Sequence, residues 1–230
     1  MVSGAKYLGA ILKDDSGLSN TSGLMVAMEN MFHTPKAEMD YFMADLSGIS
    51  YDPHPRSSKR PEDRYFQLTF KATADCLSGS HLTLAAQRFQ NAMVRLTTAA
   101  PIQDEWIEKE DLLGFLRSLL AKCTVEAVCG KTFAEKYPNF TEDFYEYNAE
   151  IPKFLHGLPR FLISRKSWNA RERCIATLQD WRKNFTEQDF DGNAMITRRW
   201  KHFSEMELSD YAVGCQDLGI LWGWVSSPIL

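Results

Sequence analysis

The sequence predicts a mainly helical protein. Apolar residues recur at intervals of three and four along most of the chain, which is the period of helices with one buried face. Strand signals are nearly absent, apart from short β-prone runs such as YFQLTF at residues 65–70. With 230 residues and 44% hydrophobic content, the chain can bury a sizeable core. We therefore expect one domain over residues 1–230, built from helices too unequal for a four-helix bundle.

The N-terminal part carries two short helical patterns and then a loop. Met25, Met28 and Met31 lie near helical spacing, and a second apolar set follows Pro35. We expect two short helices or one broken helix here. Residues 50–65 read SYDPHPRSSKRPEDRY, with three prolines and three serines. This composition predicts a surface loop without a regular element.

Two long helices are expected next. Ser80 is expected to cap the first, whose apolar positions have helical spacing. These positions are Leu82, Ala85, Phe89, Ala92, Met93 and Leu96. The second should begin near Asp104, where acidic residues favour the helix dipole, and stop at Gly130. Its leucine-rich pattern predicts a helix that is almost all core.

Three further helical patterns complete the chain. Thr141, followed by two acidic residues, opens a helix that Pro152 begins to end, and HGLP at residues 156–159 predicts a turn. The next pattern uses Trp168, Ile175, Leu178, Trp181 and Phe185. The last helix is expected from about Ser204 onward. Its final apolar stretch, residues 218–230, would be about 20 Å long as a helix, which is too short to cross a bilayer.

The charge and the cysteines argue against several classes of function. A net charge of −4 lacks the basic face that phosphate binding requires, so we expect no nucleic-acid partner. Five cysteines without a C-x-x-C pair argue against a disulfide framework and a zinc site, and favour a reducing compartment. We recognise neither a signal peptide nor a membrane anchor in residues 1–17.

Common catalytic motifs are absent. The sequence contains no G-x-S-x-G, Walker loop, G-x-G-x-x-G or H-E-x-x-H, and its histidines lack metal-ligand spacing. We therefore assign no catalytic residue and no metal ligand. The carboxylates at residues 104–111 are interpreted as a solvated helix start, His156 as a turn residue, and Cys123 with Glu126 as structural.

Residues 123–175 carry a series of spaced motifs. A T-x-E-A-x-x-G stretch is followed by a Pro-Asn-Phe turn, an aromatic helix, a G-L-P-R turn and an Ala-Arg pair. Their order and spacing resemble the middle of fungal microsomal-type cytochromes P-450, most of all the branch related to bile-acid hydroxylases and prostacyclin synthase. The matching residues are Thr124, Glu126, Ala127, Gly130, Pro138, Asn139, Phe140, Phe144, Tyr145, Tyr147, Asn148, Gly157, Leu158, Pro159, Arg160, Ala170 and Arg171.

The resemblance implies the N-terminal and central helical portion of a cytochrome P-450-like fold, ending within the long central helix over the haem. The LWG triplet at residues 221–223 follows the pattern of that helix, whereas Ser227 and Pro228 replace its usual Asn and Thr. Gly223, Ser226 and Ser227 would then lie nearest the oxygen that the haem iron binds. The alternative is that they are ordinary packing residues of an apolar helix.

The resemblance also implies a cofactor and partners. The family uses haem, O2 and electrons from an NADPH-dependent reductase to oxidise small apolar substrates such as steroids, terpenoids or fatty acids, at the cytosolic face of the endoplasmic reticulum membrane. Arg64 and Lys71 lie in the region of the haem-propionate contact, without the family's Trp. The family's E-x-x-R helix and F-x-x-G-x-x-x-C-x-G loop are not found in the sequence.

We therefore expect a partial cytochrome P-450-like chain that binds no haem and is inactive alone. Without an anchor it should be cytosolic or peripheral. A second hypothesis, from a different class, is a non-catalytic helical interaction protein whose apolar C-terminal helix docks onto a hydrophobic partner.

Overall fold

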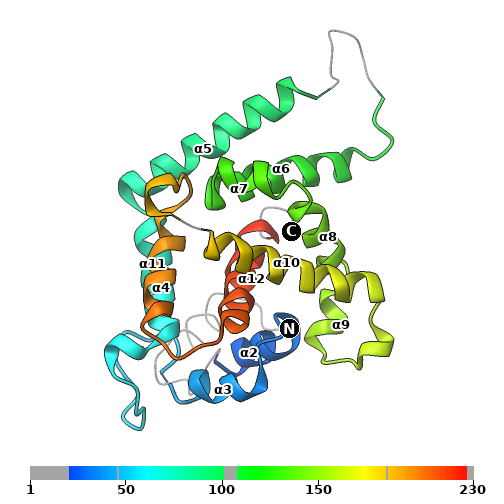
Figure 1. Ribbon diagram of the computed structural model, residues 1–230. Coiled ribbons are helices and arrows are strands. Elements are labelled where there is room, and N and C mark those ends of the chain that lie inside the picture. Colours follow the sequence, from blue (N-terminus) through cyan, green and yellow to red (C-terminus); the bar gives the residue numbers. More distant parts are fainter. Residues whose placement is uncertain (1–20, 46, 101–107, 185, 227–230) are drawn as a thin grey trace, which may run out of the picture.

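The computed structural model describes residues 21–45, 47–100, 108–184 and 186–226, and in these ranges every regular element is a helix (Figure 1). The predicted mainly helical class is confirmed. The first helices are α2 (Thr21–Val26), the π-helical η2 (Ala27–Met31), α3 (Lys36–Met43), the 3-10 turn η3 (Pro61–Asp63), α4 (Tyr65–Cys76), α5 (Gly79–Thr98), α6 (Leu112–Cys129) and α7 (Lys131–Lys136). They are followed by α8 (Phe140–Asn148), α9 (Ile151–Leu155), η4 (Arg160–Leu162), α10 (Arg165–Lys183), η5 (Glu187–Asp189), α11 (Ala194–Ser204) and α12 (Asp210–Ser226).

The helix α12 lies at the centre of the molecule (Figure 1). It packs against α10, α6 and η2, while α10 also packs against α8, and α4 packs against α11. Residues 212–218 of α12 are all buried, because other helices pack around this segment and pair its polar side chains. The neighbouring helices therefore position α12 from several sides.

The N-terminal expectations are mostly confirmed. Two short helical segments, α2 with η2 and then α3, are separated at Pro35. Residues 50–60 form the expected irregular loop, but the last part of the predicted loop includes η3 and the buried Arg64. The β-prone run at residues 65–70 is the start of α4. Packing of Phe66 and Ala72 into the core outweighs the intrinsic preference of the run for a strand.

The long helices α5 and α6 begin at other positions than predicted. The N-cap of α5 is Ser78 and not Ser80. Residues 108–111 are not helical, and α6 begins at Leu112 with the Asp111 carboxylate accepting a 2.8 Å hydrogen bond from Gly114 N. The prediction of a start near Asp104 is therefore wrong for these residues, while residues 101–107 lie outside the described ranges.

The prediction that α6 is almost all core is also wrong. Leu112, Leu113 and Leu116 are 57%, 57% and 42% exposed, whereas residues 123–130 are buried. The paired ends of α5 and α6 project from the other helices (Figure 1), so the first half of α6 has few neighbours on which to bury its leucines.

Further along the chain, three boundaries differ from the predictions. α8 ends at Asn148, and Pro152 lies in the first turn of α9 because its missing N–H costs nothing there. The predicted turn at residues 156–159 is confirmed, with a left-handed Gly157 at φ 61°. Ser204 ends α11 instead of opening the last helix, which begins at Asp210. Phe185 lies outside the described residues. None of the described helices combines the length and the apolar character needed to span a bilayer.

Candidate functional site

The second half of α12 has one open side. A Cβ added at Gly219 would lie 3.1 Å from Cδ2 and Cε2 of Phe32, so the phenyl ring packs directly on the backbone of α12. One turn later, a Cβ added at Gly223 would meet no heavy atom within 4 Å. Gly223 is also exposed. The space beside α12 is thus filled by Phe32 at Gly219 and open at Gly223.

Phe32 is held in place by an unusual turn. The chain passes through the π-helical η2, where Phe32 N donates to Ala27 O at 3.1 Å, and Thr34 N then donates to Met28 O at 2.9 Å. Between them, His33 has φ 62°, a left-handed conformation that is uncommon for residues other than glycine. Such strain persists only where the surroundings impose it.

Side-chain contacts fix His33 in this conformation. Its Nδ1 donates to Glu172 Oε1 at 3.2 Å and lies 2.9 Å from Tyr211 Oη. Tyr211 donates to Glu172 Oε2 at 2.7 Å. Burial alone would raise the pKa of Glu172, but the hydrogen bonds from His33 and Tyr211 and the charge of Arg171 lower that pKa to about 2. Glu172 is therefore a carboxylate at neutral pH and anchors the turn next to Phe32.

A second anchor lies on the first half of α12. Arg199 Nη1 donates to Asp217 Oδ1 at 2.7 Å, and Trp200 Nε1 donates to Asp217 Oδ2 at 2.8 Å. Arg199 Nη2 donates to the Gln216 carbonyl at 3.0 Å. Burial raises the pKa of Asp217, but the charge of Arg199 and the Trp200 hydrogen bond oppose that shift. A charge buried this deeply is tolerable only when it is paired.

The network continues through the side chain of Gln216. Tyr65 OH in α4 donates to Gln216 Oε1 at 3.0 Å, and Gln216 Nε2 donates to Thr34 Oγ1 at 2.8 Å. All three side chains are buried. The network therefore joins α4, α11 and α12 to the residue that follows His33, and fixes α12 relative to the turn that carries Phe32.

The other predicted residues of this helix are placed differently. Ser226 is buried and its hydroxyl donates to the Trp222 carbonyl, while Trp222 Nε1 donates to Asn148 Oδ1 at 2.8 Å. Ser226 and Trp222 line a cavity of about 370 Å³ between α6, α8 and α12, and Gly223 is not among its lining residues. Ser227 lies outside the described residues. Ser226 therefore lines this cavity, whereas Gly223 does not.

The two predicted propionate ligands lie in different environments. Arg64 is buried, and its guanidinium donates to the carbonyls of Ser50 at 2.6 Å and Tyr51 at 2.9 Å and pairs with Asp45 at 3.4 Å. These contacts hold the loop before α4 in place and give each of the three guanidinium nitrogens one partner. Lys71 is exposed on α4.

The five cysteines lie on four helices, α4, α6, α10 and α12. All are buried, and burial raises the pKa of each thiol, to about 11 for Cys123. Among the described residues there is also no group of three His, Cys, Asp or Glu side chains arranged for a metal ion.

Comparisons with known proteins give two relatives, both from fungi. No family model matches the chain. The chain is 27% identical over 174 residues to cytochrome P-450 monooxygenase calL of Penicillium decumbens. The aligned residues cover 75% of this chain and 32% of that protein. It is 23% identical over 186 residues to cytochrome P-450 monooxygenase efuG of Hormonema carpetanum, covering 80% of this chain and 30% of that protein. These similarities support a cytochrome P-450-like relationship. The chain spans about a third of the length of the curated relatives it matches.

This relationship agrees with the helical fold, and it implies haem, a redox partner and apolar substrates for the family in general. Sequence reasoning placed Gly223 on the central helix but missed Asp217, Arg199 and the turn at Phe32. One signal was visible: Asp217 is the single charged residue between Tyr211 and Leu230. A lone acid within an apolar helix predicts a buried partner.

Proposed function

We propose that this chain forms a helical wall on the oxygen side of a haem-thiolate monooxygenase, with α12 facing the substrate. The observation that carries the proposal is the open side of α12 at Gly223, one turn beyond the contact between Gly219 and Phe32. The similarity to two cytochrome P-450 monooxygenases supports it. In such enzymes the bound haem supplies the activation of O2.

The residues of this chain would shape the space in which the substrate lies. Gly223 leaves room beside the helix, and the ring of Phe32 closes one end of that room with apolar surface. Apolar walls exclude water and favour apolar substrates, which agrees with steroids, terpenoids or fatty acids. Ser226 and Ser227 remain candidates for contacts near this space, and Arg64 and Lys71 remain candidates for contacts to a propionate.

The electron source and the location follow from the family resemblance. We propose that an NADPH-dependent reductase supplies the electrons, and that the complete enzyme works at the cytosolic face of the endoplasmic reticulum membrane. None of the five cysteines lies in the F-x-x-G-x-x-x-C-x-G pattern of the family's ligand loop. We therefore propose that the thiolate ligand is not supplied by residues 1–230 and that these residues alone do not catalyse the reaction.

Sequencing of the full-length transcript tests whether this chain is part of a haem-thiolate monooxygenase. We expect the transcript to encode an E-x-x-R segment and a F-x-x-G-x-x-x-C-x-G loop in the reading frame of this chain. The purified 230-residue chain, mixed with haemin, reduced and exposed to carbon monoxide, should lack the absorption band of thiolate-ligated haem. A chain that shows this band alone contradicts the proposal.

A helical interaction protein is the second candidate, and one observation favours it. Leu112, Leu113 and Leu116 are exposed on the projecting end of α6, and exposed apolar groups of this kind often mark contact surfaces. A mature transcript without the two downstream motifs, together with a stable product that co-purifies with one partner, would favour this candidate over the monooxygenase.

A further inference from the structure

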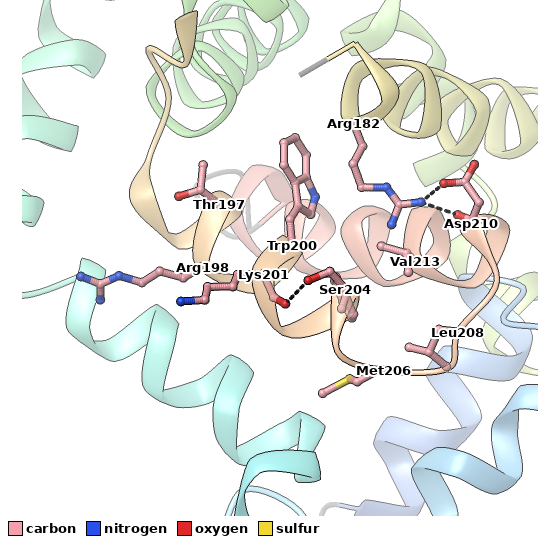
Figure 2. Close-up of a pocket in the computed structure, with 11 residues that line it drawn as sticks. Arg182, Thr197, Arg198, Trp200, Lys201, Ser204, Met206, Leu208, Asp210 and Val213 are labelled. Atoms are coloured by element: carbon pink, nitrogen blue, oxygen red, sulfur yellow. Dashed lines mark hydrogen bonds and ion pairs between the residues drawn. The ribbon is translucent and has the colours of Figure 1, made fainter. Parts of the chain in front are cut away.

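A large cavity lies apart from the open side of α12 at Gly223. It has a volume of about 720 Å³ and lies between the end of α10, one side of α11 and the start of α12 (Figure 2). This volume falls in the range of roughly 300–1,000 Å³ that is usual for small-molecule sites. Gly223, Phe32 and Ser226 are not among its lining residues. The cavity is therefore separate from the site discussed above.

One part of the cavity wall is apolar. Trp200 and Phe203 come from α11, Met206 and Leu208 from the connection to α12, and Val213 from the first turn of α12 itself. All except Leu208 are buried, so their positions are fixed by the core. This wall offers a preformed apolar surface to a ligand.

The remaining part of the wall is rich in cations. Arg182, Arg198 and Lys201 line the cavity, and Asp210 is the only acidic residue among its lining. Asp210 is shared, because it pairs with both Arg182 and Lys183. Arg198 pairs with Asp75 at 3.4 Å, outside the cavity lining. Positive charge therefore exceeds negative charge here.

Lys201 is the cation best suited to a ligand. It is exposed, and no acidic side chain of the described residues lies within ion-pair distance of it. Further positive charge is close by: the pKa of His202 is lowered by its burial and by Lys201 and Lys71, against the opposing influence of Glu205.

We propose that this cavity binds a small amphipathic carboxylate. The carboxylate pairs with Lys201, with Arg198 one helical turn away, and the apolar body lies against Trp200, Phe203 and Met206. A neutral amphiphile satisfies only the apolar wall, and a cationic one is repelled by the rim. The proposal is independent of the monooxygenase assignment, because it uses only the lining of this cavity.

The cavity wall is also joined to the centre of the fold. Trp200, which lines the cavity, donates through Nε1 to Asp217 Oδ2 at 2.8 Å in the buried network of α12. A ligand that packs on Trp200 therefore stabilises the same helix that carries Gly223. Binding should raise the thermal unfolding temperature of the protein by mass action.

Calorimetric titration of the full 230-residue chain tests the proposal, with octanoate, octanol and octylammonium, each below its micelle-forming concentration. We expect octanoate to bind most tightly, octanol at least about fivefold more weakly, and octylammonium most weakly of the three. Octanol binding as tightly as octanoate would overturn the proposal. So would binding to anionic vesicles without binding of dissolved octanoate, which would assign the basic rim to a membrane surface.

Variants locate the site. Lys201→Gln should weaken octanoate binding about fivefold and leave octanol binding unchanged, since only the ion pair is lost. Lys36→Gln, at another exposed lysine on α3, is the matched control and should bind octanoate like the parent. Ser204→Trp, at an exposed position in the cavity lining, should abolish binding of both ligands, whereas Ser80→Trp on α5 should not. Equal octanoate affinity in the parent, Lys201→Gln and Ser204→Trp would overturn the proposal.

Discussion

The two halves of α12 differ in how the chain uses them. In the first half, residues 212–218 are buried, and Gln216 and Asp217 carry a hydrogen-bonded network to α4 and α11. In the second half, Gly219 and Gly223 lack side chains. This side of the helix is covered by Phe32 at Gly219 and is open at Gly223. The same helix is thus anchored at one end and leaves space at the other.

This difference shows how a rigid wall and an open surface can share one helix. Polar contacts in the first half fix the position and rotation of α12, since a buried ion pair tolerates little displacement. The position of Gly223 then follows from the position of the anchored half of the helix. The open space beside Gly223 can therefore be kept by a helix that is held rigidly at its other end.

The largest expected effect is at the anchor. Asp217→Asn leaves Arg199 charged and buried beside a neutral amide, and should lower the free energy of unfolding by about 3–5 kcal/mol. Urea unfolding followed by circular dichroism measures this change. The matched control is Asp180→Asn, at an exposed position on α10, where the expected loss is about 0–1 kcal/mol. Equal losses in the two variants would show that the network does not anchor α12.

A smaller effect should separate the two glycines. Alanine in a helix is more favourable than glycine by about 1 kcal/mol, so Gly223→Ala should stabilise the protein by up to about that amount. At Gly219 the same change places a Cβ 3.1 Å from the ring of Phe32, which must move. We expect Gly219→Ala to be less stable than Gly223→Ala by about 1 kcal/mol or more. Equal stabilities, measured by thermal unfolding, would mean that Phe32 does not pack on α12.

Stability should also depend on pH at the turn beside Phe32. The pKa of Glu172 falls from 4.5 to about 2 on folding, so its contribution is complete above about pH 4.5 and is lost as the pH falls toward 2. Glu172→Gln should remove this part of the curve. The difference between the free energies of unfolding of parent and variant should therefore shrink between pH 5 and pH 2. A constant difference over this interval would contradict the account of the turn.

Local patterns predicted the elements better than their ends. Pro35 and the proline-rich residues 50–60 interrupt helices because proline lacks an N–H and restricts the chain before it. The start of α6 was placed too early because an acidic stretch favours a helix start without fixing it, and Asp111 supplies the actual cap. The β-prone run at residues 65–70 was misleading because the environment of α4 is set by distant segments.

The candidate site was predictable only in part. The pattern around Gly223 placed it on the central helix, and the resemblance named the family. The contact of Phe32 with Gly219 and the pairing of Arg199 with Asp217 join distant parts of the chain, and a single sequence does not show which segments meet. The left-handed conformation of His33 depends on Glu172 and Tyr211, so no local signal predicts it.

The most direct measurement uses the protein encoded by the complete transcript and a matched pair of leucine variants. A Cβ at Gly23 in α2, like one at Gly223, would meet no heavy atom within 4 Å, so both positions have space for a Cβ. The account predicts that both Gly223→Leu and Gly23→Leu show the absorption of thiolate-ligated haem. The spectral shift on addition of an apolar substrate should be lost only in Gly223→Leu. Retention of that shift in Gly223→Leu, or its loss in both variants, would contradict the claim that the open side of α12 faces the substrate.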